Sequence, residues 1–228
     1  MISFFNAINT YTDASVTTDA SGKTVTCAGY VTVFQREVID SGIKIVHNTT
    51  NNYGEILAIY MGVISLLQHK NYDAFLNLFS DSKISVCGLK EWIYSWVRDM
   101  DPRTRELYNS SHVPVSNQEI FCNIVNCIVQ NNTHMSIFHQ RGHRNPDKVD
   151  EMEEVRNTFM QINGTEITDD IIREICYYND MVDNMTRNHL LNEVSSPEYN
   201  SNKFSKPTVI VSRVLDFDIM KRYKNLVS

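Results

Sequence analysis

Residues 24–48 read TVTCAGYVTVFQREVIDSGIKIVHN, two runs dense in valine, isoleucine, threonine and aromatic side chains. Side chains of this kind fit the pleated, half-buried surface of a sheet, so each run predicts a β-strand. Asp40-Ser41-Gly42 has the composition of a turn and is expected to interrupt the second run. Together with a strand over residues 8–12, the two runs predict a three-stranded antiparallel meander.

A helix is predicted directly after this meander. Apolar residues recur at three- and four-residue steps after Asn52, which indicates an amphipathic helix to about Gln68. The elements expected next are a strand over 75–79, a helix with its apolar side at Leu89, Trp92, Ile93 and Trp96, a helix over 116–130 and a strand over 134–139. This order predicts an α/β fold with a mixed five-stranded sheet, three antiparallel strands and then two parallel ones, flanked by helices.

The last third of the chain departs from this pattern. Residues 145–178 contain nine acidic and three basic residues, so this segment carries the whole formal net charge of −6. Thr168 is expected to cap a helix that continues to about Leu191. Residues 193–228 hold a linker and a C-terminal extension with a β-prone run, a candidate segment for binding a protein partner. We therefore expect one domain over residues 1–192, with an acidic insertion at about 145–178, followed by this extension.

The composition excludes several classes of protein. No apolar run approaches the roughly 20 residues of a membrane-spanning helix, and the first residues lack the pattern of a secretory signal. These two observations predict a cytoplasmic protein that does not bind membranes. The five cysteines form no C-x-x-C pair, and in such a protein they are expected to be reduced thiols. Because the chain outside the acidic segment is formally neutral, the negative net charge does not exclude a nucleic-acid ligand.

Three carboxylates stand at the ends of predicted elements. Asp13 and Asp81 each follow a strand, and Glu55 opens the first helix. Each has a local interpretation: Asp13 as a turn residue, Glu55 as the partner of Asn52 in a capping box, and Asp81 or Ser80 as a helix cap.

Their joint arrangement favours a metal site over these local roles. If the first and fourth strands lie parallel and adjacent, their ends meet at one edge of the sheet, where the helix can also present Glu55. Like charges at such short range require compensating cations, and carboxylate oxygens select Mg²⁺ or Mn²⁺.

Six stretches resemble the type 1 ribonuclease H family and occur in that family's order: YTDAS, TTNNYGEILAIYMGV, LFSDSKISVCGLKEWIYSW, VPVSNQEIFCNIVNCIVQ, FHQRGH and NDMVDNMTR. The resemblance implies the ribonuclease H-like fold. It also implies an endonuclease that hydrolyses the RNA strand of RNA–DNA hybrids with two divalent cations and leaves 3′-hydroxyl and 5′-phosphate ends.

The resemblance also implies the catalytic residues, which are Asp13, Glu55, Asp81, Asp183 and His143. The four carboxylates would hold the cations, with Asp13 between both ions, and His143 would assist the leaving group or product departure, since histidine exchanges protons near neutral pH. Asp183 could instead be a solvated carboxylate paired with Arg187. Asp180 and Asp150 are the competing candidates for the fourth ligand.

Substrate contacts follow from the same resemblance. Asn51 and Asn52 match residues on the RNA side of the minor groove, where 2′-hydroxyls distinguish the two strands. The remaining candidates are Thr50 in a pocket for a DNA phosphate, Trp92 in the channel of the DNA strand, Lys83 near the RNA strand, and Ser15 in the turn after Asp13.

Two other functions remain open. One is a non-catalytic domain of this fold that binds nucleic acid, and the other is a junction resolvase of the same superfamily. Proofreading exonucleases carry D-x-E in the first strand, whereas this chain has Asp13-Ala14-Ser15, which excludes them. If the acidic insertion is an external addition, excising it should preserve cleavage and tighten hybrid binding at low salt.

Overall fold

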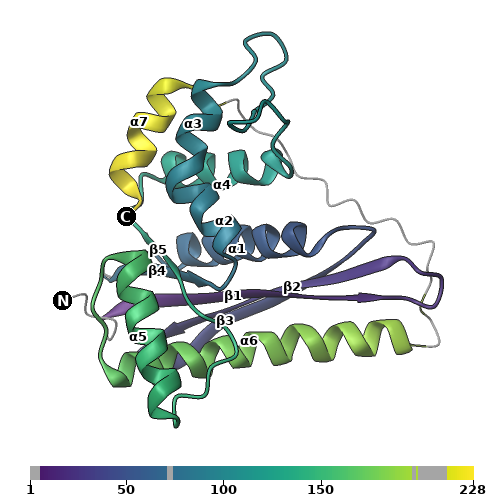
Figure 1. The fold of residues 1–228 in the computed structure, drawn as a ribbon, viewed down its shortest axis with the longest axis vertical. Helices are drawn as coiled ribbons and strands as arrows, with labels where there is room; N and C mark the ends of the chain where they lie inside the picture. The colour runs from purple at the N-terminus through teal and green to yellow at the C-terminus, as the bar shows by residue number, and fades with distance from the viewer. Residues whose placement is uncertain (1–5, 71–73, 197–198, 200–214) are drawn as a thin grey trace.

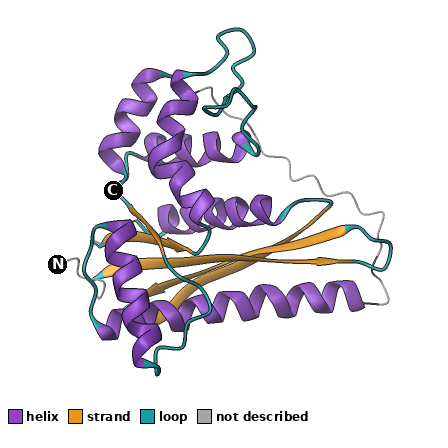
Figure 2. Ribbon diagram, in the orientation of Figure 1, coloured by secondary structure: helices purple, strands orange, loops and turns teal. Residues whose placement is uncertain are grey.

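The computed structural model describes residues 6–70, 74–196, 199 and 215–228. Its centre is a five-stranded sheet with the order β3-β2-β1-β4-β5 (Figures 1 and 2). The strands are β1 (Ala7–Thr18), β2 (Thr24–Phe34), β3 (Glu37–His47), β4 (Phe75–Ser80) and β5 (Ser136–His139). The first three pair antiparallel, whereas β4 is parallel to β1 and β5 is parallel to β4. The predicted mixed sheet is confirmed.

The chain reverses between β2 and β3 at Gln35 and Arg36. Both residues have positive φ, 51° and 67°, as a tight hairpin turn requires. The predicted turn at Asp40-Ser41-Gly42 is wrong, because this segment stays in β3 and a bulge in the β2–β3 pairing absorbs the extra residue. The Asp40 carboxylate instead accepts hydrogen bonds from the hydroxyls of Tyr30 and Ser65.

The first strand is longer than the predicted one. Its pairing with β4 ends at Thr12 and Ser80, but its pairing with β2 continues to Thr18. The expectation that Asp13 terminates its strand is therefore wrong. Asp13 lies one residue beyond the last β1–β4 pair, next to the point where Asp81 follows β4, so the two carboxylates still meet at one edge of the parallel pair.

Helices cover both faces of the sheet (Figure 1). One hydrophobic core joins the sheet to α1 (Asn51–Gln68), α2 (Lys83–Cys87), the π-helical turn η1 (Gly88–Trp92), α3 (Ile93–Arg98), α4 (Gln118–Asn131) and α7 (Phe217–Leu226). A second core joins the opposite face to α5 (Val149–Asn163) and α6 (Asp169–Ser195). None of the helices in the described ranges is long and apolar enough to cross a membrane.

The acidic insertion forms α5 and the first part of α6. Thr168 caps α6 as predicted, since its hydroxyl accepts a hydrogen bond from the backbone of Ile171. On the inner side of α5, Val155 and Phe159 are buried in the second core, and the Phe159 ring lies 5.4 Å from that of Phe138 on β5. The insertion is therefore not an external loop, because it covers part of one face of the sheet.

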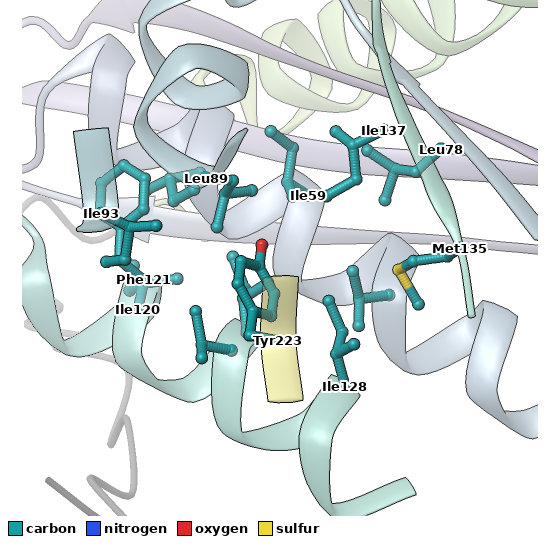
Figure 3. Packing of buried hydrophobic residues seen from close by; sticks show 14 of the residues in the cluster. Ile59, Leu78, Leu89, Ile93, Ile120, Phe121, Ile128, Met135, Ile137 and Tyr223 are labelled. Atoms are coloured by element: carbon teal, nitrogen blue, oxygen red, sulfur yellow. The ribbon is translucent and has the colours of Figure 1, made fainter. Parts of the chain in front are cut away.

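The C-terminal residues also join the main body of the fold. Tyr223 of α7 is fully buried, and Figure 3 shows it among Ile59, Leu89 and Ile128. The N–H groups of Met135 and Ile137 donate to the carbonyls of Leu226 and Ser228, and the Ser228 N–H donates to the Met135 carbonyl, so the sheet extends beyond β5. Residues 197–198 and 200–214, which include most of the predicted linker and its β-prone run, lie outside the described residues.

Candidate active site

The structure brings Asp13, Glu55 and Asp81 together. Each offers one carboxylate oxygen, and these oxygens all lie within 4.8 Å of one another. Asp13 comes from β1, Asp81 directly follows β4, and Glu55 is the fifth residue of α1. Asp13 and Glu55 are buried, and Asp81 is partly buried. The three carboxylates form a compact oxygen-lined cluster at the end of the parallel strand pair.

The local alternatives for these residues do not hold. The cap of α1 is Thr50, whose hydroxyl accepts a hydrogen bond from the backbone of Tyr53, so Glu55 is not half of a capping box with Asn52. The cap of α2 is Ser82, so Asp81 does not cap that helix. One oxygen of Glu55, Oε2, is buried without a hydrogen-bond partner among the described residues. A buried acceptor of this kind is suited to a cation.

The cluster is electrostatically unfavourable without a cation. Burial and then the charge of Asp81 raise the pKa of Asp13 to about 8. Burial and then the charges of Asp13 and Asp81 raise the pKa of Glu55 to about 9. Burial also raises the pKa of Asp81. Hard cations remove both penalties at once, because they replace the lost hydration and neutralise the repulsion. The donor set therefore fits Mg²⁺ or Mn²⁺.

Asp183 flanks this cluster from α6. It is only 8% exposed, and its charge, after burial, is among the causes that raise the pKa of Asp13 and of Asp81. The alternative pairing with Arg187 is present, since the guanidinium donates to both carboxylate oxygens at 3.1 and 2.8 Å. The carboxylate is nevertheless not solvated. Of the competing candidates, Asp180 and Asp150 are both exposed, and Asp150 lies on α5.

The position of Asp183 depends on close contact between α6 and the sheet. Gly29 on β2 pairs with Asp13, and a Cβ atom at Gly29 would lie 2.5 Å from the Thr186 methyl. The hydroxyls of Thr186 and Ser15 are 2.9 Å apart and hydrogen-bonded. Ser15, predicted to contact substrate, is thus used in docking α6 against β1.

His143 lies on the loop after β5. Its backbone has a φ of 54°, its side chain is 65% exposed, and Nδ1 lies 3.9 Å from an oxygen of Asp183. The preceding Gly142 packs against the Asp81 carboxylate so closely that a Cβ atom there would clash. The loop therefore brings His143 to the solvent side of the carboxylates.

The predicted substrate residues lie in different settings around the cluster. Asn51 lies beside the cluster, where Nδ2 donates to Glu55 Oε1 at 3.4 Å. Asn52 and Trp92 line one groove of about 270 Å³, together with Trp96 at its inner side. Thr50 is committed to capping α1, and the remaining candidate, Lys83, is exposed at the start of α2.

Several residues near the site were not predicted from the sequence. His139 Nε2 lies 3.1 Å from the backbone oxygen of Asp81, and Asn163 bonds to the backbone of His139. Gln140 donates a hydrogen bond to the side chain of Asn179 on α6. FHQRGH marked this strand end in the sequence, but no local pattern indicates a contact from Asn163, which lies 24 residues away.

Comparison with solved structures supports the fold. The prototype foamy virus protease–reverse transcriptase superposes with a TM-score of 0.52 at 13% identity, covering 82% of this chain and 22% of that one. A foamy viral protease–reverse transcriptase in complex with an RNA/DNA hybrid gives 0.50 at 14% identity, covering 70% and 20%. A foamy viral structure in complex with double-stranded DNA gives 0.50 at 19% identity, covering 63% and 87%. The chain thus spans about a fifth of the two longer viral proteins.

Sequence comparison gives the family. A search of curated proteins finds no significant match. The sequence model of the RNase H family matches residues 6–155, which include Asp13, Glu55, Asp81 and His143 but end before Asp183. Because this match spans most of the chain and the sheet has the topology expected for that fold, the chain belongs to the ribonuclease H family of enzymes.

Proposed function

We propose that this chain is an endonuclease that hydrolyses the RNA strand of RNA–DNA hybrids with the help of two divalent cations. The observation that carries the proposal is the cluster of Asp13, Glu55 and Asp81, whose oxygens converge within 4.8 Å in a chain of the ribonuclease H family. Asp183 beside this cluster completes the proposed set of four carboxylates.

Asp13, Glu55, Asp81 and Asp183 would hold the cations. Of the metals that prefer oxygen ligands, we propose Mg²⁺, with Mn²⁺ as a substitute. When bound, the cations supply Lewis-acid stabilisation of the charge that develops on the phosphate and activate water as the nucleophile. The buried Oε2 of Glu55, which has no hydrogen-bond partner in the described part of the chain, and the raised pKa of Asp13 support this assignment.

We propose that His143 donates a proton to the leaving group. Water adds to the phosphorus and the bond to O3′ breaks, so the leaving oxygen needs a proton to become a 3′-hydroxyl, while the phosphate stays on the 5′ end. An exposed imidazole on the loop beside Asp183 can deliver this proton and recover it from solvent. Nδ1 of this ring lies 3.9 Å from an oxygen of Asp183, so the imidazole stands next to the proposed metal ligands.

For the substrate, we propose a hybrid duplex read from its minor groove. The side chain of Asn51 lies beside Glu55, and the groove lined by Asn52 and Trp92 adjoins the start of α1. Amide groups can bond to 2′-hydroxyls, and an exposed indole can pack against a sugar of the strand that lacks them. A foamy viral relative in the fold comparison was solved with an RNA/DNA hybrid, which supports the same substrate class.

The test compares four substrates in Mg²⁺: an RNA–DNA hybrid, duplex RNA, duplex DNA and a four-way junction. Cleavage of the hybrid alone, within the RNA strand and with 3′-hydroxyl and 5′-phosphate ends, is the expected result. Preferential cleavage of the junction would favour a resolvase. Binding of hybrid without any cleavage in Mg²⁺ or Mn²⁺ would favour a non-catalytic domain of this fold.

We further propose residues 1–192 as the catalytic domain and residues 193–228 as an extension that packs onto it. We propose a protein partner for this extension, for which the exposed ring of Phe217 at the start of α7 is a candidate contact. The five cysteines are free thiols, which supports a cytoplasmic location.

A further inference from the structure

The end of α5 contacts the strand that leads into the active-site loop. Asn163 is the last residue of α5. Its Oδ1 accepts a hydrogen bond from the His139 N–H at 3.0 Å, and its Nδ2 donates to the His139 carbonyl at 2.8 Å. His139 lies on β5, the last strand of the described sheet order, where a neighbouring strand would otherwise supply these two bonds. Asn163 thus replaces a neighbouring strand at one residue.

The conformation of Asn163 is itself constrained. Gly164 ends the helix with a φ of 65°, and its N–H donates to the Met160 carbonyl at 2.9 Å. The hydroxyl of Thr165 donates to the Asn163 carbonyl at 3.3 Å. One turn earlier, Phe159 anchors the helix in the second core. The side-chain amide of Asn163 therefore projects from a fixed backbone toward β5.

The His139 side chain carries this contact on to the carboxylate cluster. Its Nε2 lies 3.1 Å from the backbone oxygen of Asp81. A carbonyl oxygen only accepts hydrogen bonds, so the ring must carry its proton on Nε2 and donate it. His139 is buried. Its ring therefore holds the peptide group of Asp81, while Gly142 packs against the carboxylate of Asp81.

A second set of contacts joins α5 to the loop that carries His143. Arg141 and Arg144 both pair with Glu154, at 2.9 and 3.3 Å, and the Asn145 N–H donates to Glu151 at 2.8 Å. The side chains of Arg141, Arg144 and Glu154 are partly exposed, at 27–43%, so solvent weakens each ion pair. The contact made by Asn163 is better protected, and it leads directly to a member of the cluster.

We propose that Asn163 is a positioning residue that acts through His139 to hold Asp81 in place for divalent-cation binding. This inference rests on the proposed function of the carboxylate cluster. Groups that orient metal ligands typically change metal affinity about 10- to 100-fold when removed. Because Asn163 is hydrogen-bonded to the backbone of His139, its loss should weaken cation binding. Because Asn163 lies on the insertion and is not one of the proposed substrate residues, its loss should leave the KM for hybrid unchanged.

The experiment measures Mn²⁺ binding to the full chain without substrate, by electron paramagnetic resonance of the free ion. Asn163→Ala should weaken binding of Mn²⁺ at least about tenfold. Asn157→Ala is the matched control, because Asn157 is an exposed asparagine on the same helix, and it should bind as wild type does. In hybrid cleavage, Asn163→Ala should need more Mg²⁺ for half-maximal rate and recover most of its kcat at saturating Mg²⁺.

A second variant tests the link through the ring. His139→Phe keeps a flat aromatic ring and the backbone groups that bond to Asn163 but removes the Nε2–H, and it should weaken Mn²⁺ binding like Asn163→Ala. A folded Asn163→Ala protein that binds Mn²⁺ within twofold of wild type would overturn the inference. If Asn163→Ala does not fold, His139→Phe decides by the same criterion.

The two proposals can fail separately. If wild type does not cleave hybrid but its Mn²⁺ binding is weakened by Asn163→Ala, the proposed function fails and the positioning role stands. If wild type cleaves hybrid and both variants bind Mn²⁺ normally, only the positioning role fails. A wild-type protein that binds no Mn²⁺ would overturn both.

Discussion

Repulsion within the carboxylate cluster links metal binding to folding at the residue scale. Asp13 and Glu55 are buried with raised pKa values, which means that the folded protein binds their protons more tightly than the unfolded chain does. Any cation that binds the cluster must displace these protons. Metal affinity should therefore increase with pH through the range in which these carboxylates titrate.

The first prediction concerns isosteric neutralisation of the cluster. Asp13→Asn, Glu55→Gln and Asp81→Asn each remove a ligand charge without removing volume. Losing about 4 kcal/mol of transition-state stabilisation would slow cleavage of hybrid roughly a thousandfold. Asp183→Asn should also cripple the enzyme. Melting temperature without metal should not fall, because neutralisation removes repulsion.

Asp150→Asn is the control for this series, because Asp150 is an exposed carboxylate on α5. It should retain near wild-type activity. More than about a tenth of wild-type activity in all three cluster variants would contradict the two-metal assignment, and an inactive Asp150→Asn with an active Asp183→Asn would reassign the fourth ligand.

The second prediction is a pH dependence of stability in the metal-free protein. The pKa of Asp13 rises from 3.8 to about 8 on folding, and that of Glu55 from 4.5 to about 9. For raised pKa values, the folded state holds more protons than the unfolded state between these limits, so the free energy of unfolding falls as pH rises. With chelator present, the contribution of the cluster to the melting temperature (Tm) should decrease as the pH is raised from about 5 to about 9.

Two comparisons isolate this effect from other titrating groups. The double variant Asp13→Asn/Glu55→Gln should flatten the loss of Tm with rising pH. In wild type, Mg²⁺ should raise Tm more at pH 8 than at pH 5, since protons compete less. A Tm profile that is identical in wild type and the double variant would show that the cluster does not contribute.

At the scale of elements, the site depends on how closely α6 lies on β2. Gly29→Ala places a methyl group 2.5 Å from Thr186 Cγ2, so the third prediction is that α6 shifts, Asp183 moves from the cluster and hybrid cleavage falls at least about tenfold. Thr186→Ser removes this methyl but keeps the hydroxyl that bonds to Ser15.

The double variant Gly29→Ala/Thr186→Ser should therefore recover activity that Gly29→Ala loses. Thr186→Ser alone serves as the control and should stay close to wild type. Full activity in Gly29→Ala would show that the distance between α6 and β2 does not determine the position of Asp183.

Most elements could be predicted from the sequence because they depend on local periodicity. The spacing of apolar residues after Asn52 predicted α1, and the two β-rich runs predicted β2 and β3. The failures involve contacts between distant residues. The Asp40-Ser41-Gly42 turn is overridden by a bulge and by bonds to Asp40, and the contact of Asn163 with His139 joins an insertion to a strand end. The three clustered carboxylates were accessible to sequence reasoning because each was predicted to follow a strand or open a helix. For Asp13 this prediction is wrong in detail, since β1 continues past it, but the β1–β4 pairing ends one residue before Asp13.

For the whole molecule, the insertion is both a structural element and the source of the net charge. Val155, Phe159 and Ile167 are buried in the second core, and each such side chain stabilises the fold by about 1.5–3 kcal/mol. Excision from Asn145 to Thr168 through a short Gly-Ser connector would expose Phe138 and remove Asn163. Such a deletion is expected to unfold the protein or weaken its metal binding, contrary to the expectation for an external addition.

The final prediction separates the charge of the insertion from its packing. Asp150, Glu153, Glu166 and Asp170 are exposed. Changing all four to the corresponding amides removes negative charge and leaves the buried side of α5 intact. Long-range repulsion of phosphates should then decrease, so hybrid should bind several-fold more tightly at low salt. The difference should disappear near 0.5 M salt, where screening limits the interaction between charges to about 4 Å. Unchanged binding at low salt, with wild-type Tm, would place the insertion outside the electrostatic range of the bound hybrid.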